Sequence, residues 1–226
     1  MELDQLDVKI IFLHGRLNEE ILMTQPKRYI DPKSADCVCL LKRSLYGLKQ
    51  SPKQWYLRFD EFMITHGYVC VYYKMVKSGN YIYLLLYVDN ILIACSERDE
   101  IEALKQLLNS EFDMKDLGPV KKILGMEIIR NRRNGTMILS QSKYLEKLLE
   151  SFGMSSNKSI VTLLASHFKL SCSLCLRIDE EICEMTKVSY VNVVGCTMYA
   201  MVLTRPDLAH ALSIVSRFMA SPGKEH

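Results

Sequence analysis

A three- and four-residue spacing of apolar positions predicts the helices of this chain. The clearest case is 53–66, where Pro52 stands at the expected start and Gly67 at the expected end. A second helix is expected after Ser96, which together with Asp99 resembles a capping box. The same spacing predicts further helices over 142–152, 188–203 and 206–220.

Strands are predicted where β-branched and aromatic residues form short runs. Runs at 70–76 and 80–95 flank Ser78-Gly79-Asn80 and are expected to form a β-hairpin. Asp89 and Asn90 interrupt the second run, so we expect them at a turn between strands. A second hairpin is expected from 122–130 and 136–140, because the Asn134-Gly135 step favours a tight turn.

Mixed strands and helices therefore come first and helices dominate the end, which is an α+β pattern. Residues 14–36 are polar and turn-rich and are expected to form extended excursions or loops. The segment 154–186 is expected to be the least structured part of the chain.

Composition narrows the class of protein. The chain has 226 residues, of which 49% are hydrophobic, and 29 Lys+Arg against 26 Asp+Glu give a net charge of +3. This is a globular composition, with room for one domain or two small ones. The acidic N-terminus does not resemble a targeting segment, so we expect an intracellular protein, cytoplasmic or nuclear. The longest apolar run, Tyr81 to Cys95, is about half the length of a lipid-spanning helix, so no membrane partner is expected.

The eight cysteines are expected to be free thiols. Cys172, Cys175 and Cys183, with His167, could in principle supply four zinc ligands. Because no second paired motif stands at a finger-like distance, free thiols in a loop are the favoured interpretation.

Two acidic residues, Asp7 and Asp89, stand inside apolar, strand-like surroundings. Burial of a carboxylate costs several kcal/mol unless a cation or hydrogen bonds compensate it. One interpretation is structural: Lys9 or another base pairs with either residue, or the hairpin ends leave both in water. The other is that both converge across neighbouring strands as ligands of Mg²⁺.

A series of sequence blocks resembles copia-type retrotransposon reverse transcriptase, in the order of that family and over nearly the whole chain. The blocks are Asp7-Val-Lys, Phe12-Leu-His-Gly15, Ser44-Leu-Tyr-Gly-Leu-Lys-Gln-Ser-Pro-Lys-Gln-Trp55, Leu85-Leu-Tyr-Val-Asp-Asn90, Phe112-Asp-Met-Lys-Asp-Leu-Gly118, Ile123-Leu-Gly-Met-Glu-Ile128, Leu139-Ser-Gln141, Thr204-Arg-Pro-Asp207 and Ser221-Pro-Gly-Lys-Glu-His226. One block alone would be weak evidence, whereas the ordered series is specific.

The resemblance implies a right-hand polymerase, with a palm of antiparallel sheet backed by helices, partial fingers and a helical thumb. It places the palm and partial fingers in 1–140, with a fingers-like excursion near 14–50, and the thumb or connection region in 141–226. The upstream fingers strands and the ribonuclease H segment lie outside the matched blocks, which predicts an uncovered sheet edge.

For catalysis the resemblance implies two Mg²⁺ ions held by Asp7 and by the aspartates of a Tyr-x-Asp-Asp turn. Asp89 matches the first turn aspartate, but the second is Asn90. Asn is neutral and offers one carbonyl oxygen in place of two charged ones, so Mg²⁺ binding and catalysis are expected to suffer.

Other positions are expected to contact nucleotide or nucleic acid by the same resemblance. A bulky Ile11 is expected to crowd the nucleotide pocket, so that Asn90→Asp alone would restore metal binding more than polymerisation. Leu124-Gly125 resembles the primer grip, and otherwise reads as a strand with a glycine where another backbone approaches. The nucleotide-binding residues would be Val8, Ile11, Phe12, Tyr46, Gly47 and Gln50, and the backbone-binding ones Lys121, Lys122, Arg130, Arg132 and Arg133.

Three hypotheses for the function follow. The first is a degenerate reverse transcriptase fragment whose partners are primer–template, deoxynucleotides and the remainder of a Pol polyprotein. The second is a weakly active polymerase that uses Asp7 and Asp89 alone. The third is a binding remnant that keeps affinity for RNA–DNA without catalysis.

Overall fold

The computed structural model describes residues 1–69, 71–165, 168–175, 179–186 and 188–226. The chain divides into two compact units, Met1–Val120 and Lys121–His226. None of the helices described is long and apolar enough to cross a membrane.

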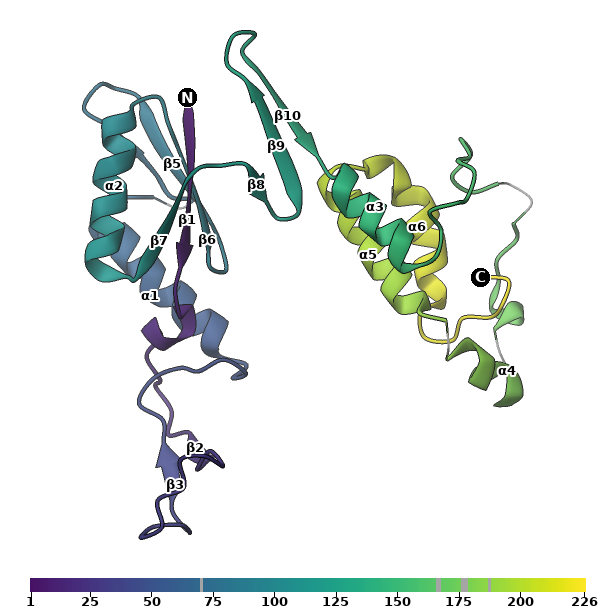
Figure 1. Ribbon diagram of the computed structural model, residues 1–226, viewed down its shortest axis with the longest axis horizontal. Helices are drawn as coiled ribbons and strands as arrows, with labels where there is room; N and C mark the ends of the chain where they lie inside the picture. Colours follow the sequence, from purple (N-terminus) through teal and green to yellow (C-terminus); the bar gives the residue numbers. More distant parts are fainter. Residues whose placement is uncertain (70, 166–167, 176–178, 187) are drawn as a thin grey trace. The chain divides into compact units, whose positions relative to one another are not determined.

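An antiparallel sheet of five strands forms the centre of the first unit (Figure 1). The strand order is β4-β5-β6-β1-β7, so the first strand of the chain lies inside the sheet. The strands are β1 (Glu2–Val8), β4 (Tyr73–Met75), β5 (Tyr81–Tyr87), β6 (Asn90–Cys95) and β7 (Met114–Pro119). The predicted first hairpin is thus confirmed over the described residues; Cys70, at the start of the predicted run, lies outside them.

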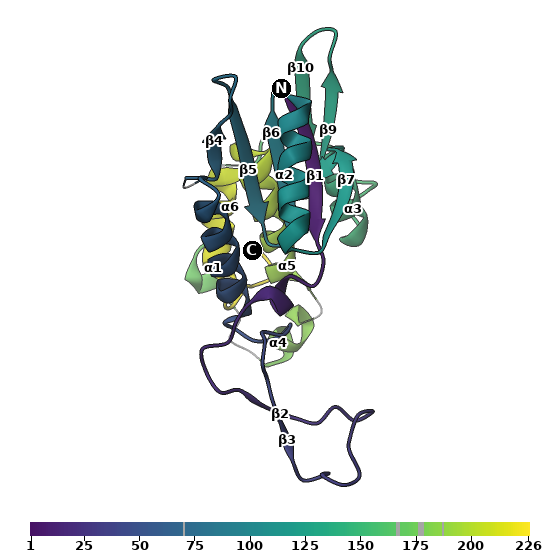
Figure 2. The ribbon, with the colours of Figure 1, turned by 90° about the vertical axis from the view of Figure 1, so that its left-hand side faces the viewer.

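Two helices, α1 (Ser51–Thr65) and α2 (Arg98–Glu111), cover one face of this sheet (Figure 2). They confirm the two helices predicted for this part of the chain. The succession β1, α1, β5, β6, α2, β7 is the β-α-β-β-α-β order of ferredoxin-like folds, with β4 added at the edge. The mixed architecture predicted from the periodicity is therefore present in this unit.

Alternation along the strands explains why the helices lie on one face only. Leu6, Ile82, Leu84, Ile91 and Ile93 point to the helices and are buried. The core against them is largely aromatic, with Trp55, Phe59 and Phe62 of α1 and Phe112 at the end of α2. We call the opposite side of the sheet its open face.

The capping box predicted at Ser96 and Asp99 is wrong. Helix α2 starts after Glu97, and no side chain caps its N-terminus. The Glu97 carboxylate instead accepts hydrogen bonds from Ser78 and Asn80 in the β4–β5 turn. This long-range contact fixes the helix start, which local pattern alone could not show.

The excursion between β1 and α1 is mostly irregular, as the composition predicted. It contains a 3₁₀ turn, η1 (Ile11–His14), and a two-stranded ribbon of β2 (Leu22–Thr24) and β3 (Val38–Leu40). Gln25 braces the ribbon, since its amide group donates to the carbonyls of Ser34 and Cys37.

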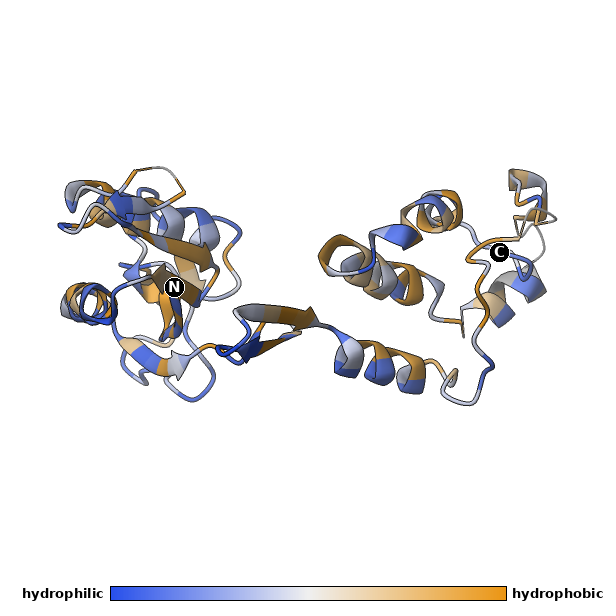
Figure 3. Ribbon diagram, turned by 90° about the horizontal axis from the view of Figure 1, so that it is seen from above, coloured by the Kyte–Doolittle hydropathy of each residue, from blue (hydrophilic) through white to orange (hydrophobic). Residues whose placement is uncertain are grey.

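The second unit contains its own three-stranded sheet, β10-β9-β8, followed by helices. The strands are β8 (Lys122–Ile123), β9 (Met126–Asn131) and β10 (Thr136–Ser140), and the helical segments are α3 (Ser142–Ser151), η2 (Cys172–Leu174), α4 (Asp179–Met185), α5 (Tyr190–Leu203), η3 (Pro206–Leu208), α6 (Ala209–Val215) and η4 (Ser216–Phe218). Polar and apolar residues alternate around α3, the helix that follows the hairpin (Figure 3).

The structure adjusts two sequence-based expectations in this unit, which begins at Lys121 because β8, β9 and β10 pair with one another and not with the five-stranded sheet. The helix expected over 206–220 is divided into η3, α6 and η4. The segment 154–186, expected to be the least structured part of the chain, contains η2 and α4 among its described residues.

Candidate active site at the β5–β6 turn

The block Tyr87-Val-Asp-Asn90 forms a tight turn between β5 and β6. Tyr87 and Asn90 pair across the strands, so Val88 and Asp89 make a two-residue turn, as predicted. Val88 has φ of 57°, a left-handed conformation that is strained for a β-branched residue. The buried indole of Trp55 on α1 donates a hydrogen bond to the Val88 carbonyl at 2.9 Å and so holds the turn in place.

Asp7 lies beside this turn because β1 pairs with β6. The register places Asp7 opposite Asn90, and the Val8 amide donates to the Asp89 carbonyl at 2.8 Å. The expectation that the two acidic blocks form adjacent strands is confirmed. Asp7 and Asp89 are both half-buried at the same end of the central strands.

A chain of side-chain hydrogen bonds fixes the turn residues. Gln5 Nε2 donates to Asn90 Oδ1 at 3.0 Å, and Asn90 Nδ2 donates to Asp89 Oδ1 at 2.8 Å. The Asn90 amide therefore occupies one oxygen of the Asp89 carboxylate. Sequence reasoning missed Gln5, although it stands two residues before Asp7 and hence on the same face of β1.

The structure also bears on the alternative explanation for the two carboxylates. Lys9 pairs with Asp113 at 2.9 Å rather than with Asp7. Its salt bridge is exposed and lies between the end of β1 and the residue before β7. Lys9 therefore forms its salt bridge with Asp113 and not with Asp7 or Asp89.

The donor set determines which metal the site could hold. Asp7 and Asp89 supply hard carboxylate oxygens, which suit a divalent ion such as Mg²⁺. The carbonyl oxygen of Asn90 faces Gln5, so the third ligand implied by the family pattern is engaged elsewhere. Within the described part of the chain, no group of three or more His, Cys, Asp or Glu residues could hold a metal. This includes Cys172, Cys175 and Cys183, whereas His167 of the zinc hypothesis lies outside the described residues.

Part of the expected nucleotide pocket comes together near η1. The half-buried Phe12 ring meets the Tyr46 ring edge-on, with 4.6 Å between centroids. Gly47 follows with φ of 96°, a conformation that favours glycine, and Gln50 stands at the N-terminal boundary of α1.

The expectation that Ile11 crowds this pocket is wrong. Ile11 is only 1% exposed and belongs to the hydrophobic core, as does Val8 at 3%. Ile10, in a left-handed conformation with φ of 52°, turns the chain so that Ile11 faces inward. Replacement of Ile11 by Ala would leave a cavity in the core rather than widen a nucleotide site.

Leu124-Gly125 forms a turn and not the continuous strand expected from the sequence. Ile123 pairs with Met126, and the two residues between them have φ of 49° and 73°. Positive φ at both central positions is the pattern of a type I′ hairpin turn. Tyr199 of α5 donates to the Leu124 carbonyl at 2.7 Å and fixes the turn within the second unit.

The five basic residues expected to contact the nucleic-acid backbone are exposed but lie toward opposite ends of β9 rather than in one cluster. Lys122 lies opposite Glu127, which also pairs with Lys143 at 2.6 Å. Arg132 and Arg133 stand in the β9–β10 turn, at the other end of β9. Arg130 is next to that turn, and Lys121 next to Lys122.

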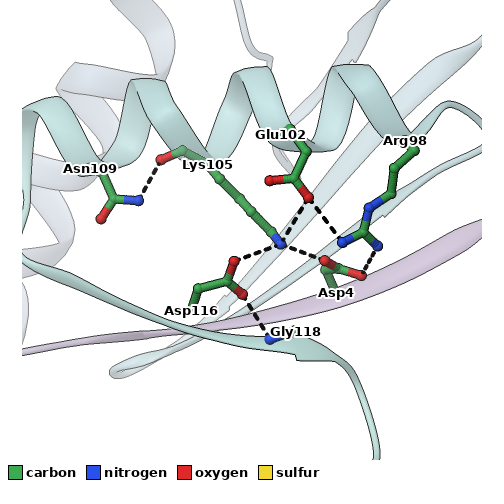
Figure 4. A network of polar contacts seen from close by, with 7 residues as sticks. All are labelled: Asp4, Arg98, Glu102, Lys105, Asn109, Asp116 and Gly118. Atoms are coloured by element: carbon green, nitrogen blue, oxygen red, sulfur yellow. Dashed lines mark hydrogen bonds and ion pairs between the residues drawn. The ribbon is translucent and has the colours of Figure 1, made fainter.

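An ion cluster that the sequence did not indicate anchors β1 to α2 on the helix side of the sheet (Figure 4). Asp4 is fully buried and accepts from Arg98 and from the nearly buried Lys105. Lys105 also donates to Asp116 on β7 at 2.9 Å, and the Gly118 amide donates to the same residue. Burial lowers the pKa of Lys105, but its ion pairs with Asp4 and Asp116 outweigh this, so that the pKa is raised. The cluster joins β1 and β7 to α2 behind the candidate site.

The comparisons with known proteins identify the class. A family model described as "Reverse transcriptase (RNA-dependent DNA polymerase)" matches residues 1–166. Because the match spans more than half of the chain, the chain belongs to this family. Reverse transcriptases act on nucleic-acid templates and generally use divalent metal ions.

Individual relatives narrow the class to retrotransposon proteins. A retrovirus-related Pol polyprotein from transposon TNT 1-94 of Nicotiana tabacum is 50% identical over 100% of the chain, and one from transposon RE1 of Arabidopsis thaliana is 33% identical over 98%. The chain spans only 18% and 15% of their lengths. The putative transposon Ty5-1 protein of Saccharomyces cerevisiae is 29% identical over 98% of the chain, which spans 71% of it. The chain thus belongs to the reverse transcriptase family and is similar to retrotransposon Pol polyproteins, so the resemblance stated above is confirmed.

Proposed function

We propose that this chain is the palm, partial fingers and thumb region of an RNA-directed DNA polymerase whose catalytic step is impaired. The first unit would be the palm, with the excursion between β1 and α1 as part of the fingers, and the second unit would be the thumb or connection region. Its substrates would be an RNA–DNA primer–template and deoxynucleotides, and its partner the remainder of a Pol polyprotein.

The observation that carries the proposal is the hydrogen-bond chain Gln5–Asn90–Asp89 beside Asp7. Asp7 and Asp89 would hold Mg²⁺, which supplies charge neutralisation at the primer 3′-hydroxyl and the triphosphate. Asn90 adds no negative charge and draws one Asp89 oxygen into a hydrogen bond. If this removes about 3 kcal/mol of transition-state stabilisation, the rate falls roughly 140-fold at about 1.4 kcal/mol per decade.

Two other groups of residues would position the substrates. Phe12 and Tyr46 form an aromatic pair that would contact the incoming sugar and base. The exposed Lys and Arg side chains of the β8–β10 sheet would contact phosphates. Such contacts do not depend on bound metal ions. A non-catalytic role in binding primer–template is therefore the second candidate function.

Primer extension tests the first candidate. With Mg²⁺, deoxynucleotides and an RNA template annealed to a DNA primer, we expect little or no extension by the native chain, close to the background given by Asp89→Asn, the matched control that removes the remaining turn carboxylate. Extension that is fast in the native chain and lost in Asp89→Asn would refute the proposed impairment. Duplex binding without extension in both chains would favour the second candidate.

A further inference from the structure

Three aromatic rings from separate segments of the chain meet beside the β5–β6 turn. The ring centroid of His14 lies 5.8 Å from that of Trp55 and 5.4 Å from that of Phe112, and the last two are 5.3 Å apart. Trp55 and Phe112 are each 2% exposed, whereas His14 is half-buried. His14 thus contributes the most exposed ring of this group, which we call the aromatic triad.

A close approach of the chain to α1 places His14 against Trp55. A Cβ atom on Gly15 would lie 2.9 Å from the Cβ of Gln54 on α1, which is closer than van der Waals contact allows. Only glycine therefore fits between η1 and the helix without a shift of the backbone. This contact brings together the residue before Gly15, which is His14, and the residue after Gln54, which is Trp55.

The triad supports the contact that holds the candidate active site. The Trp55 indole donates to the Val88 carbonyl at 2.9 Å, and Val88 has the strained left-handed conformation described above. A strained turn keeps its conformation only while its surroundings hold it. Aromatic ring contacts contribute beyond their buried area, so His14 restricts the position of the indole that bonds to the turn.

Burial and charge favour the uncharged form of His14. The charged residues on the elements packed against it are Lys9 after β1, Arg43 before α1, Arg58 on α1 with its partner Glu111 on α2, and Asp113 before β7. Burial lowers the pKa of His14 below its ordinary value of 6.5, and Arg43 and Arg58 act in the same direction. A hydrogen bond to the Lys9 backbone and the charge of Asp113 oppose this without reversing it. A proton on His14 is therefore disfavoured while its ring remains in the triad.

We propose that His14 is a positioning residue of the candidate active site, whose uncharged ring keeps the Trp55 indole hydrogen-bonded to the Val88 carbonyl. Protonation would draw the ring toward solvent, loosen the indole and release the turn that carries Asp89. The proposal rests on the proposed function, because it takes this turn as the metal-binding one. It assigns a role to a residue that does not itself contact metal or substrate.

Trp55 is the only tryptophan of the chain and is therefore a direct probe. Deuterium exchange of its indole N–H, followed by NMR on the full chain and compared with the intrinsic rate at each pH, reports the hydrogen bond to Val88. At about pH 7.5 we expect roughly two- to tenfold faster exchange in His14→Ala, the range that corresponds to the loss of an aromatic contact. In the native chain, protection should fall as the pH falls below 6.5. Trp55 emission should be quenched over the same range, because a protonated imidazole interacts with the indole.

Two variants separate the effect of the ring from that of its proton. His14→Phe keeps a ring in the triad but cannot be protonated, so it should retain most of the indole protection and lose the pH-dependent change. His66→Gln is the matched control, because His66 is also half-buried against an aromatic ring of α1, that of Phe62, with 4.3 Å between centroids. It should leave both the protection and its pH dependence unchanged.

Three results would overturn the positioning role. The first is native protection in His14→Ala, and the second is a pH-dependent change of emission that persists in His14→Phe. The third is a transition above 6.5, which would mean that the indole holds the charged ring instead. Should His14→Ala unfold, His14→Phe and the native pH titration still decide the question.

Mg²⁺ titration of the same chains separates this inference from the proposed function. We expect His14→Ala to bind Mg²⁺ several-fold more weakly than the native chain at about pH 7.5. Faster indole exchange with unchanged Mg²⁺ affinity would show a structural contact only and would overturn the positioning role. No Mg²⁺ binding by the native chain would count against the proposed function, whereas indole exchange would still decide whether His14 holds the turn.

Discussion

The change Asn90→Asp should destabilise the protein without metal and make it strongly metal-dependent. In the native chain Asn90 Nδ2 donates to Asp89 Oδ1 at 2.8 Å, while Gln5 donates to Asn90 Oδ1. Gln5 can donate to an Asp at position 90 equally well. The donor toward Asp89 is lost, however, and two carboxylates then face each other.

The magnitude follows from the two contacts. A hydrogen bond to a charged group contributes about 1.5–3 kcal/mol. Two like charges about 4 Å apart near a protein surface repel by up to about 4 kcal/mol, which solvent reduces at these half-exposed side chains. We expect a net loss of at least about 2 kcal/mol, or a fall in Tm of roughly 4–8 °C for a chain of this length. Saturating Mg²⁺ at about 100 Kd should restore about 2.7 kcal/mol.

The pH dependence of the metal-free variant has a definite sign. Repulsion raises the pKa of one carboxylate in the folded state above its unfolded value. The variant is therefore least destabilised below the unfolded value, near pH 4, and loses stability as the pH rises through the folded value.

Thermal melts with and without Mg²⁺ at pH 4 to 7 check this, with Asn90→Ala as the matched control. Ala loses both hydrogen bonds without adding charge, so its melt should not respond to Mg²⁺ more than that of the native chain. The reasoning fails if metal-free Asn90→Asp is as stable as the native chain, or if Mg²⁺ stabilises it no more than Asn90→Ala. Because Ile11 lies in the core, recovery of primer extension should need no change at that position.

Three further predictions concern other contacts. Trp55→Phe should lose the hydrogen bond to the Val88 carbonyl, destabilise the fold by about 1–2 kcal/mol in urea unfolding and weaken Mg²⁺ binding; an unchanged midpoint and metal affinity would contradict this. Lys105→Met should lower the free energy of unfolding by about 3–5 kcal/mol because it leaves the buried Asp4 without its main partner, and the double change with Asp4→Leu should recover part of that loss. In the native chain, the stability that Lys105 contributes should be fully present below the pKa of an unfolded lysine. It should be lost as the pH rises through the raised pKa of Lys105 in the folded state. Affinity for an RNA–DNA duplex should fall with salt, and neutral substitution at the basic positions should flatten this slope; a slope that does not change would exclude the residues Lys121, Lys122, Arg130, Arg132 and Arg133.

Structural features that depend on residues close together in the chain could be predicted from the sequence. Helix α1 and the β5–β6 turn followed from local periodicity and from the polar interruption at Asp89 and Asn90. The ordered family blocks added the pairing of β1 with β6, which no local pattern contains.

What the sequence could not show depends on side chains that meet only after folding. Trp55 reaches Val88, and Lys105 reaches Asp4, across long stretches of chain. Ile11 was expected to face the nucleotide pocket but lies in the core. The left-handed conformation of Ile10, just before the 3₁₀ turn, directs the Ile11 side chain inward.

The central position of β1 has a consequence for how the chain folds during synthesis. Its ladder partners are Asn90–Cys95 on one side and Met114–Pro119 on the other. Neither edge of β1 can therefore pair until these later segments have been synthesised. At about 5–20 residues per second, the ribosome needs several seconds to deliver them. Contacts of such high sequence separation also form slowly once available. Strand β1 is therefore made before its partners and is among the last of these strands to be fully paired, and until then the nascent chain exposes two strand edges that chaperones or neighbouring chains can bind.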